Sequence, residues 1–204
     1  MNKKVLNHFK KNDPLLYSFA IKVGNDLKPF LTQKANPKNY FSSLCREIIG
    51  QQLSGKVAEV IFDRFSKLYP KGINPKVIIN TTYEKLRKVG MSNAKAKYVK
   101  NLAEAVNDNS LQVDRLDSLS DEEVKKQLIK VKGIGPWTAE MFLMFTLARP
   151  DVFSHGDLGL RKGIKKIYGF KKDPSLKTVE KIIKKWSPYK TYASLILWES
   201  FDVK

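Results

Sequence analysis

The residues available for chemistry in this chain are limited by its few cysteines and histidines. Cys45 is the only cysteine, and His8 and His155 are the only histidines. The chain therefore cannot form an intrachain disulfide, an iron–sulfur cluster or a zinc site built from several thiolates and imidazoles. Chemistry must come from carboxylates, hydroxyls, lysines or the backbone, and we expect no metal site made by side chains and no organic cofactor.

The segment VKGIGPWTAE, residues 131–140, lies between two stretches with a helical pattern. A glycine turn at the start of a helix leaves backbone N–H groups pointing outward, where the helix dipole also favours an anion. We therefore expect Gly133 and Gly135 to bind phosphate, with Pro136 in the first helical turn. A plain corner between two helices explains the same residues, since glycine and proline punctuate loops of many kinds.

A second candidate for chemistry is Asp157, which precedes LGLRKGIKKIYG. An aspartate before a helical pattern is typical of an N-cap. The helix dipole would also stabilise its ionised form, so a structural role and a chemical role are compatible.

The charge of the chain indicates its partner. Its 38 Lys and Arg against 20 Asp and Glu give a formal net charge of +18 in 204 residues. Such a field attracts polyanions, first of all nucleic acid and then an anionic membrane surface. No apolar run reaches the roughly 20 residues that span a bilayer, and the basic N-terminus is not followed by a secretory apolar region. We expect a cytoplasmic protein, with no membrane partner, that associates with the nucleoid in a prokaryote or enters the nucleus in a eukaryote.

The elements that position these residues follow a helical pattern throughout, so the predicted class is all-α. Ser92 and Ser120 are expected N-caps, Glu123 completes a capping box with Ser120, and Gly90 ends a helical unit that begins at Pro75. The apolar run AEMFLMFTLA predicts a buried helix. Further helices are expected in residues 40–50, 55–69, 92–106, 120–129, 158–169, 175–186 and 189–200.

Several motifs in order resemble one family, the helix-hairpin-helix DNA glycosylases, and within it the alkylation-repair branch of 3-methyladenine glycosylases of the second type. The hairpin itself is LIKVKGIGPWTAEMFLMF, and the similarity runs from about Phe41 to Trp198. The other matching segments are REIIGQQLSGKVA, VGMSNAKAKYVKNLA, DVFSHGDLGLRKG and WSPYKTYASLILW. The resemblance implies one domain, 1–204, of two helical lobes with a cleft for DNA and the base between them, and with the hairpin at about 120–148.

The resemblance assigns catalysis to Asp157, while Asp151 is expected to be structural. The implied reaction flips a damaged purine out of double-stranded DNA and hydrolyses its bond to deoxyribose. A carboxylate stabilises the positive charge that develops on the sugar and orients or deprotonates the attacking water. In relatives that also cut the strand, a lysine occupies the place of Trp137, so we expect no lyase activity.

The same resemblance implies the surroundings of the base. Trp137, Met141 and Trp198 match pocket positions, and Met141 replaces a tyrosine of the best-known branch. Core packing is the alternative for Trp137 and Trp198, as it is for Trp186. Gln52 and Leu53 are the candidate wedge that enters the duplex, although the turn at 51–53 also reads as a simple helix connection.

Phosphate contacts are expected at Gly133 and Gly135, supported by Lys132, Arg161 and Lys162. Relatives also hold a monovalent cation with backbone carbonyls of the hairpin, and a monomer is expected. Two other functions stay open: a DNA-binding protein that has lost the chemistry, and a glycosylase for deaminated or oxidised bases.

Overall fold

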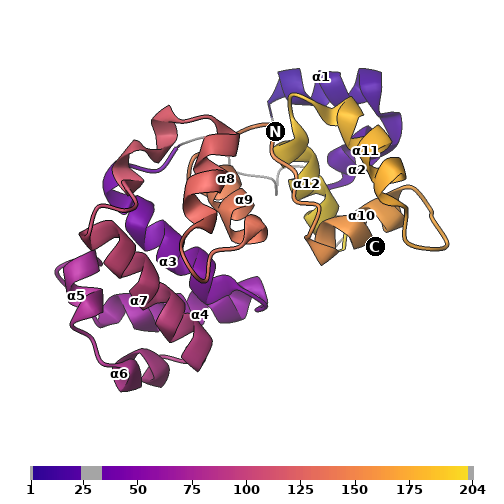
Figure 1. The fold of residues 1–204 in the computed structure, drawn as a ribbon. Coiled ribbons are helices and arrows are strands. Elements are labelled where there is room, and N and C mark those ends of the chain that lie inside the picture. The colour runs from indigo at the N-terminus through magenta and orange to yellow at the C-terminus, as the bar shows by residue number, and fades with distance from the viewer. Residues whose placement is uncertain (1, 24–33, 202–204) are drawn as a thin grey trace. The chain divides into compact units, whose positions relative to one another are not determined.

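The computed structural model describes residues 2–23 and 34–201. Within these ranges the chain forms α-helices and short 3-10 helices and no strand, which confirms the predicted all-α class (Figure 1). Backbone contacts divide it into two compact units. We call Ala35–Leu147 the hairpin unit, and Met1–Lys34 with Ala148–Lys204 the terminal unit. Each is described by itself.

The hairpin unit is built around the helix α3, Tyr40–Gly50, whose Leu44, Ile48 and Ile49 are fully buried. Helices α4, α7 and α9 pack on α3. Burial of this apolar surface is the main stabilising contribution to the unit. Its elements are η2 (Pro37–Asn39), α3, α4 (Gly55–Lys67), α5 (Pro75–Ile79), α6 (Tyr83–Lys88), α7 (Asn93–Asn107), η3 (Val113–Ser118), α8 (Asp121–Ile129) and α9 (Pro136–Phe145).

Local polar residues set the helix starts in this unit as the sequence predicts. The Ser92 side chain accepts from the Lys95 amide at 3.2 Å, and Ser120 forms the capping box with Glu123. Gly90 follows α6 with a φ of +110°. The run AEMFLMFTLA forms most of α9, in which both apolar and small residues are buried, as predicted for a helix surrounded by protein.

The single helical unit expected between Pro75 and Gly90 is instead two short helices. Asn74 caps α5, and Thr82 caps α6 by accepting from the Lys85 amide. The Thr81 hydroxyl donates to the carbonyl of Val77 at 2.6 Å, at the end of α5. Side chains that bond to nearby backbone in this way favour helix ends, which explains the break.

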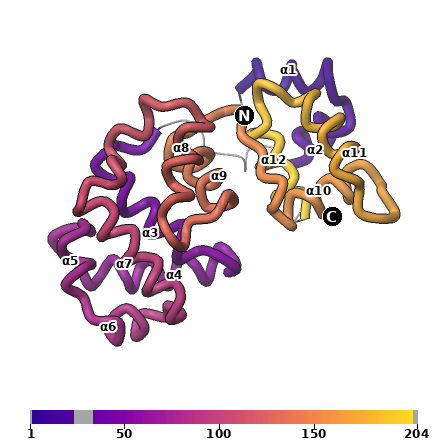
Figure 2. The backbone as a smooth tube through the Cα atoms, in the orientation of Figure 1, coloured from indigo at the N-terminus to yellow at the C-terminus, as the bar shows by residue number. Residues whose placement is uncertain are grey.

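The terminal unit joins the two ends of the chain. Figure 2 shows its indigo N-terminal helices among the orange and yellow C-terminal ones. Helices α1 and α2 were not predicted. Its elements are α1 (Lys3–Asn12), α2 (Pro14–Val23), α10 (Leu158–Ile167), α11 (Leu176–Ile183), η4 (Lys184–Trp186) and α12 (Lys190–Glu199).

Asp13, between α1 and α2, holds the N-terminal helices in the terminal unit. Its Oδ2 accepts from the Trp186 indole N–H at 2.9 Å and from the Tyr168 hydroxyl, and its Oδ1 accepts from the Leu16 amide at 3.2 Å. Asp13 and Trp186 are both buried. Of the two roles considered for Trp186, core packing is therefore confirmed.

Among the helices in the described ranges, none has the length and apolar character needed to cross a membrane.

Candidate functional site

The turn between α8 and α9 depends on Gly133. Its φ is +109°, and an added Cβ would lie 2.2 Å from Cγ of Tyr98 on α7. Both the backbone conformation and the space therefore require glycine. This glycine is explained by the fold alone.

Neither the backbone conformation nor the surrounding space requires a glycine at position 135. Its φ is −97° at the N-cap of α9, and an added Cβ would meet no atom within 4 Å. The amides of Gly133 and Gly135 donate to no other group in the part of the chain that the structure describes. Two unsatisfied N–H groups before a helix form a suitable anion site, and an open position at Gly135 lets a phosphate approach the backbone.

The loop of the hairpin is fixed from outside by two side-chain amides. Gln51, at the C-cap of α3, donates through Nε2 to the carbonyl of Gly133 and to the hydroxyl of Thr138, both at 2.9 Å. Asn101 of α7 donates to the carbonyl of Lys132, also at 2.9 Å. The sequence did not predict this support, since its partners are 82 and 31 residues away along the chain.

Trp137 and Met141 lie one turn apart on α9. Trp137 is half-buried in the first turn, whereas Met141 is buried, with 3% of its surface exposed. Their assignment to a base pocket stays a prediction.

The turn between α3 and α4 places Gln52 at an exposed position with a φ of +57°. A left-handed conformation is unfavourable for a glutamine and costs on the order of 1 kcal/mol, and such strain concentrates at functional positions. Leu53 is half-buried, and its amide donates to the carbonyl of Gly50. The wedge role of Gln52 and Leu53 stays a prediction.

Asp157, in the terminal unit, is the N-cap of α10. Its Oδ1 accepts from the Leu160 amide at 2.8 Å and from the indole N–H of Trp198 at 3.1 Å, and 9% of the residue is exposed. The predicted N-cap is therefore confirmed. Two donors on a nearly buried oxygen hold the carboxylate in a fixed orientation.

Trp198 reaches Asp157 because α10 has glycines, with no side chains, on the face that packs against α12. An added Cβ at Gly159 would lie 2.9 Å from Nε1 of Trp198 and 3.0 Å from Oδ1 of Asp157. At Gly163 it would lie 2.8 Å from Cβ of Leu197. The sequence left Trp198 open between a pocket position and core packing and did not predict this hydrogen bond. The available signal was the pair of glycines spaced four apart on α10, Gly159 and Gly163.

The predicted cationic supports lie in both units. Lys132 and Lys162 are exposed, and Arg161 is half-buried on α10. Their phosphate contacts stay a prediction.

Asp151 has the structural role expected of it. Its carboxylate accepts from the Lys190 backbone amide and ammonium group, each at 3.1 Å, and from the Ser187 hydroxyl. These bonds fix the start of α12.

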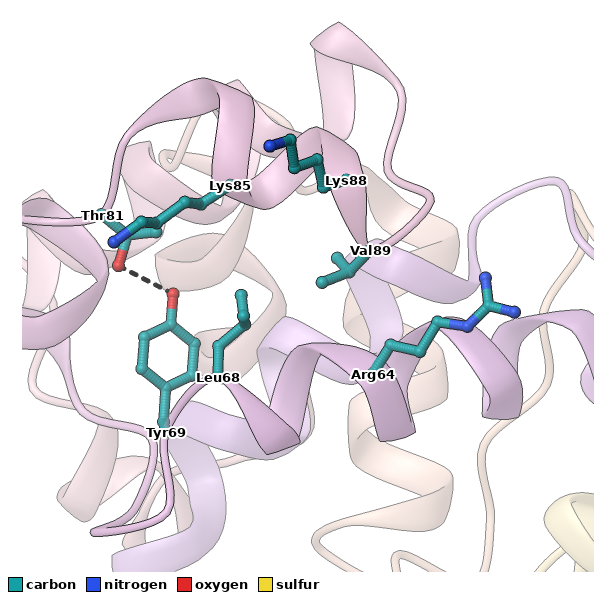
Figure 3. A pocket seen from close by; sticks show the side chains of 7 residues that line it. All are labelled: Arg64, Leu68, Tyr69, Thr81, Lys85, Lys88 and Val89. Carbon is teal, nitrogen blue, oxygen red and sulfur yellow. Dashed lines mark hydrogen bonds between the residues drawn. The ribbon is translucent and has the colours of Figure 1, made fainter.

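A separate cavity of about 550 Å³ lies in the hairpin unit (Figure 3). Tyr69 donates to Thr81 across it at 2.9 Å. No sequence-predicted site residue lines this cavity; its lining consists of Arg64, Leu68, Tyr69, Thr81, Lys85, Lys88 and Val89.

A family model decides the assignment. The model described as HhH-GPD superfamily base excision DNA repair protein matches residues 45–188, which include both the hairpin and Asp157. The chain belongs to the HhH-GPD superfamily.

Relatives in this superfamily include a putative DNA-3-methyladenine glycosylase, YfjP, of Bacillus subtilis, at 34% identity over 97% of this chain and 69% of that protein. DNA-3-methyladenine glycosylase 1 of Schizosaccharomyces pombe is 32% identical over 88% of this chain and 79% of its own. The solved structure of the S. pombe 3-methyladenine DNA glycosylase Mag1 in complex with abasic DNA matches with a TM-score of 0.88 and 31% identity, covering 98% of this chain and 97% of that one. The family resemblance inferred from the motifs is confirmed.

Proposed function

We propose that this chain is a monofunctional DNA glycosylase that releases alkylated purines such as 3-methyladenine from double-stranded DNA. The observation that carries the proposal is the carboxylate of Asp157, held at the start of α10 by the Leu160 amide and the Trp198 indole. The relatives named as 3-methyladenine glycosylases support the substrate class.

In the proposed reaction, the bond between C1′ and the purine nitrogen breaks and its electron pair leaves with the base. The sugar gains oxocarbenium character, which the Asp157 carboxylate stabilises. Water then adds to C1′ and loses a proton, with Asp157 orienting or deprotonating it. An alkylated purine already carries a positive charge and is a good leaving group.

The hairpin supplies positioning in this proposal. The amides near Gly133 and Gly135 bind phosphate, with Lys132, Arg161 and Lys162 as electrostatic support. Trp137 offers an aromatic face to an electron-poor base. It also occupies the position at which relatives that cut the strand have a lysine. Met141 and Trp198 complete the pocket, and Gln52 with Leu53 fill the space the base leaves in the duplex.

Two finer points belong to the same proposal. The protein acts as a monomer on chromosomal DNA, in the cytoplasm of a prokaryote or the nucleus of a eukaryote. A monovalent cation on hairpin carbonyls adds positive charge near a phosphate, but the carbonyls of Lys132 and Gly133 already accept from Asn101 and Gln51. Each of these oxygens keeps a second lone pair, so they remain available to the ion together with the other carbonyls of the loop.

The test is incubation with methylated duplex DNA and chromatography of the released bases, followed by electrophoresis of the strand without alkali. We expect release of 3-methyladenine and an intact strand. DNA binding without release would favour a non-catalytic binding protein. Strand cleavage without alkali would contradict the expectation that a chain with Trp137 in place of the lyase lysine has no lyase activity.

A further inference from the structure

The side chain of Gln51 joins the turn between α3 and α4 to the loop of the hairpin. Its Nε2 donates to the carbonyl of Gly133 and to the hydroxyl of Thr138, each over 2.9 Å. An amide nitrogen has two hydrogens, one for each acceptor, and a carbonyl can only accept, so the amide group has one possible orientation. Gln51 is half-buried, which limits competition from water. One side chain therefore connects the end of α3 to the hairpin loop and to the first turn of α9.

Helix α7 holds the same two segments from a second side. Lys95 donates to the carbonyl of Ile49 near the end of α3, and Asn101 donates to the carbonyl of Lys132 in the hairpin loop, each over 2.9 Å. These contacts and the bonds of Gln51 all lie within the hairpin unit. Removing the bonds of Gln51 leaves both segments attached to α7, so we expect the fold to survive their loss.

The residue that follows Gln51 is held in an unfavourable conformation. Gln52 has a φ of +57° and an exposed side chain that makes no hydrogen bond among the described residues. A side chain at a left-handed position persists where neighbouring contacts fix the backbone. On one side these contacts are the bonds of Gln51, and on the other the Leu53 amide donates to the carbonyl of Gly50 at 3.1 Å. Gln51 thus sets the position from which Gln52 projects.

We propose that Gln51 is a positioning residue that couples two contacts with DNA, a phosphate at the hairpin loop and Gln52 in the duplex. The inference rests on the proposed function, which assigns those contacts to the loop and to Gln52 with Leu53. The hydrogen bonds of Gln51 set the distance between them, so a phosphate held near Gly133 and Gly135 brings Gln52 to one position along the DNA. Without these bonds the turn moves relative to the loop, and phosphate binding no longer places Gln52 beside the target base.

This coupling has a signature that a purely structural role lacks. If Gln51 acts through Gln52, removing the Gln52 side chain also removes the benefit of Gln51, so the effects of the two substitutions are not additive. A residue that only stabilised the fold would slow the reaction equally with and without the Gln52 side chain. Binding to undamaged duplex should be retained, because Asn101 still holds the loop that contacts phosphate.

The experiment measures single-turnover release of 3-methyladenine from methylated duplex DNA at saturating protein, by the parent, Gln51→Met, Gln52→Ala and the double variant. Methionine keeps the length of the side chain and lacks both N–H donors. We expect each single variant to lose about tenfold or more in rate, and Gln51→Met to cost less than about threefold once Gln52 is alanine. Affinity for undamaged duplex, from fluorescence anisotropy, should stay within about threefold of the parent's in every variant.

Gln112→Met is the matched control. Gln112 is exposed in the same unit, and its side chain makes no hydrogen bond among the described residues. This variant should keep the parent rate. If Gln51→Met does not fold, Thr138→Val takes its place, because it removes one of the two acceptors, and its loss in rate should likewise disappear once Gln52 is alanine.

Each other outcome has a definite meaning. Losses that multiply in the double variant would overturn the coupling and leave the proposed function standing. An unchanged rate in Gln51→Met or in Gln52→Ala would do the same, as would an affinity for undamaged duplex that falls in step with the rate. No release of 3-methyladenine by the parent would contradict the proposed function itself.

Discussion

The indole N–H of Trp198 donates to Oδ1 of Asp157 over 3.1 Å, linking α12 to the first residue before α10. The bond joins residues 41 apart in the chain and orients the carboxylate on which the proposed reaction depends. A donor to an ionised group contributes more than a neutral hydrogen bond, typically about 1.5–3 kcal/mol.

Trp198→Phe should keep the aromatic ring and lose this donor. If the bond orients Asp157, base release should slow by roughly tenfold or more, a change that corresponds to about 1.4 kcal/mol of transition-state stabilisation. The measurement is the single-turnover rate of 7-methylguanine release beside thermal unfolding. An unchanged rate in a folded variant would show that the bond is only structural.

Gly159→Ala should disturb the same pair from the other side. The new methyl group would come within 3.0 Å of both the Trp198 indole nitrogen and the Asp157 oxygen, so one of them must move. We expect a tenfold or greater loss of the release rate. Gly156→Ala, where an added Cβ meets nothing within 4 Å, is the matched control and should keep the parent rate.

The two hairpin glycines should respond differently to alanine. Gly133→Ala combines a φ of +109° with a contact at 2.2 Å to Tyr98, so we expect unfolding free energy to fall by about 2 kcal/mol or more. Gly135→Ala should leave the unfolding free energy within about 1 kcal/mol of the parent. If phosphate approaches Gly135, that variant should bind DNA more weakly and with less dependence on salt, measured by fluorescence anisotropy. Equal DNA affinity would remove Gly135 from the phosphate site.

The stability of the protein should depend on the ionisation of Glu47. Its pKa is raised from 4.5 to about 7 in the folded state, so the folded state holds the proton more tightly than the unfolded one. The resulting stabilisation is fully present below about pH 4.5 and is lost as pH rises through about 7, by on the order of 1–3 kcal/mol. Denaturant unfolding of the parent and Glu47→Gln between pH 4.5 and 8 should show a smaller decline in the variant. Parallel curves would mean that the folded-state pKa is ordinary.

The sequence predicted the parts of the fold that are encoded locally. The caps at Ser92, Ser120 and Asp157 depend on residues three positions away, so their polar patterns were sufficient. The N-terminal helices were missed because their docking depends on Asp13 and its partners Tyr168 and Trp186, more than 150 residues away. A proline directly after Asp13 also reads as a break rather than as the first turn of α2.

The same distinction applies to the candidate site. The motifs indicated Asp157, Trp137 and the hairpin glycines by type and order. The contact of Gln51 with Gly133, and that of Trp198 with Asp157, depend on how helices pack, and no local pattern specifies them. Glu47 was missed because the burial that raises its pKa depends on how α3 packs with other helices and not on its neighbours in sequence.

The most direct test of the central claim is release of 3-methyladenine from methylated duplex DNA by the parent protein and by Asp157→Asn. Asparagine keeps the size of the side chain and an oxygen that can cap α10, but it removes the negative charge that the reaction needs. We expect the parent to release the base and the folded variant to lose at least a hundredfold in rate while still binding DNA. Equal release by the two proteins would contradict the assignment of Asp157 as the catalytic carboxylate.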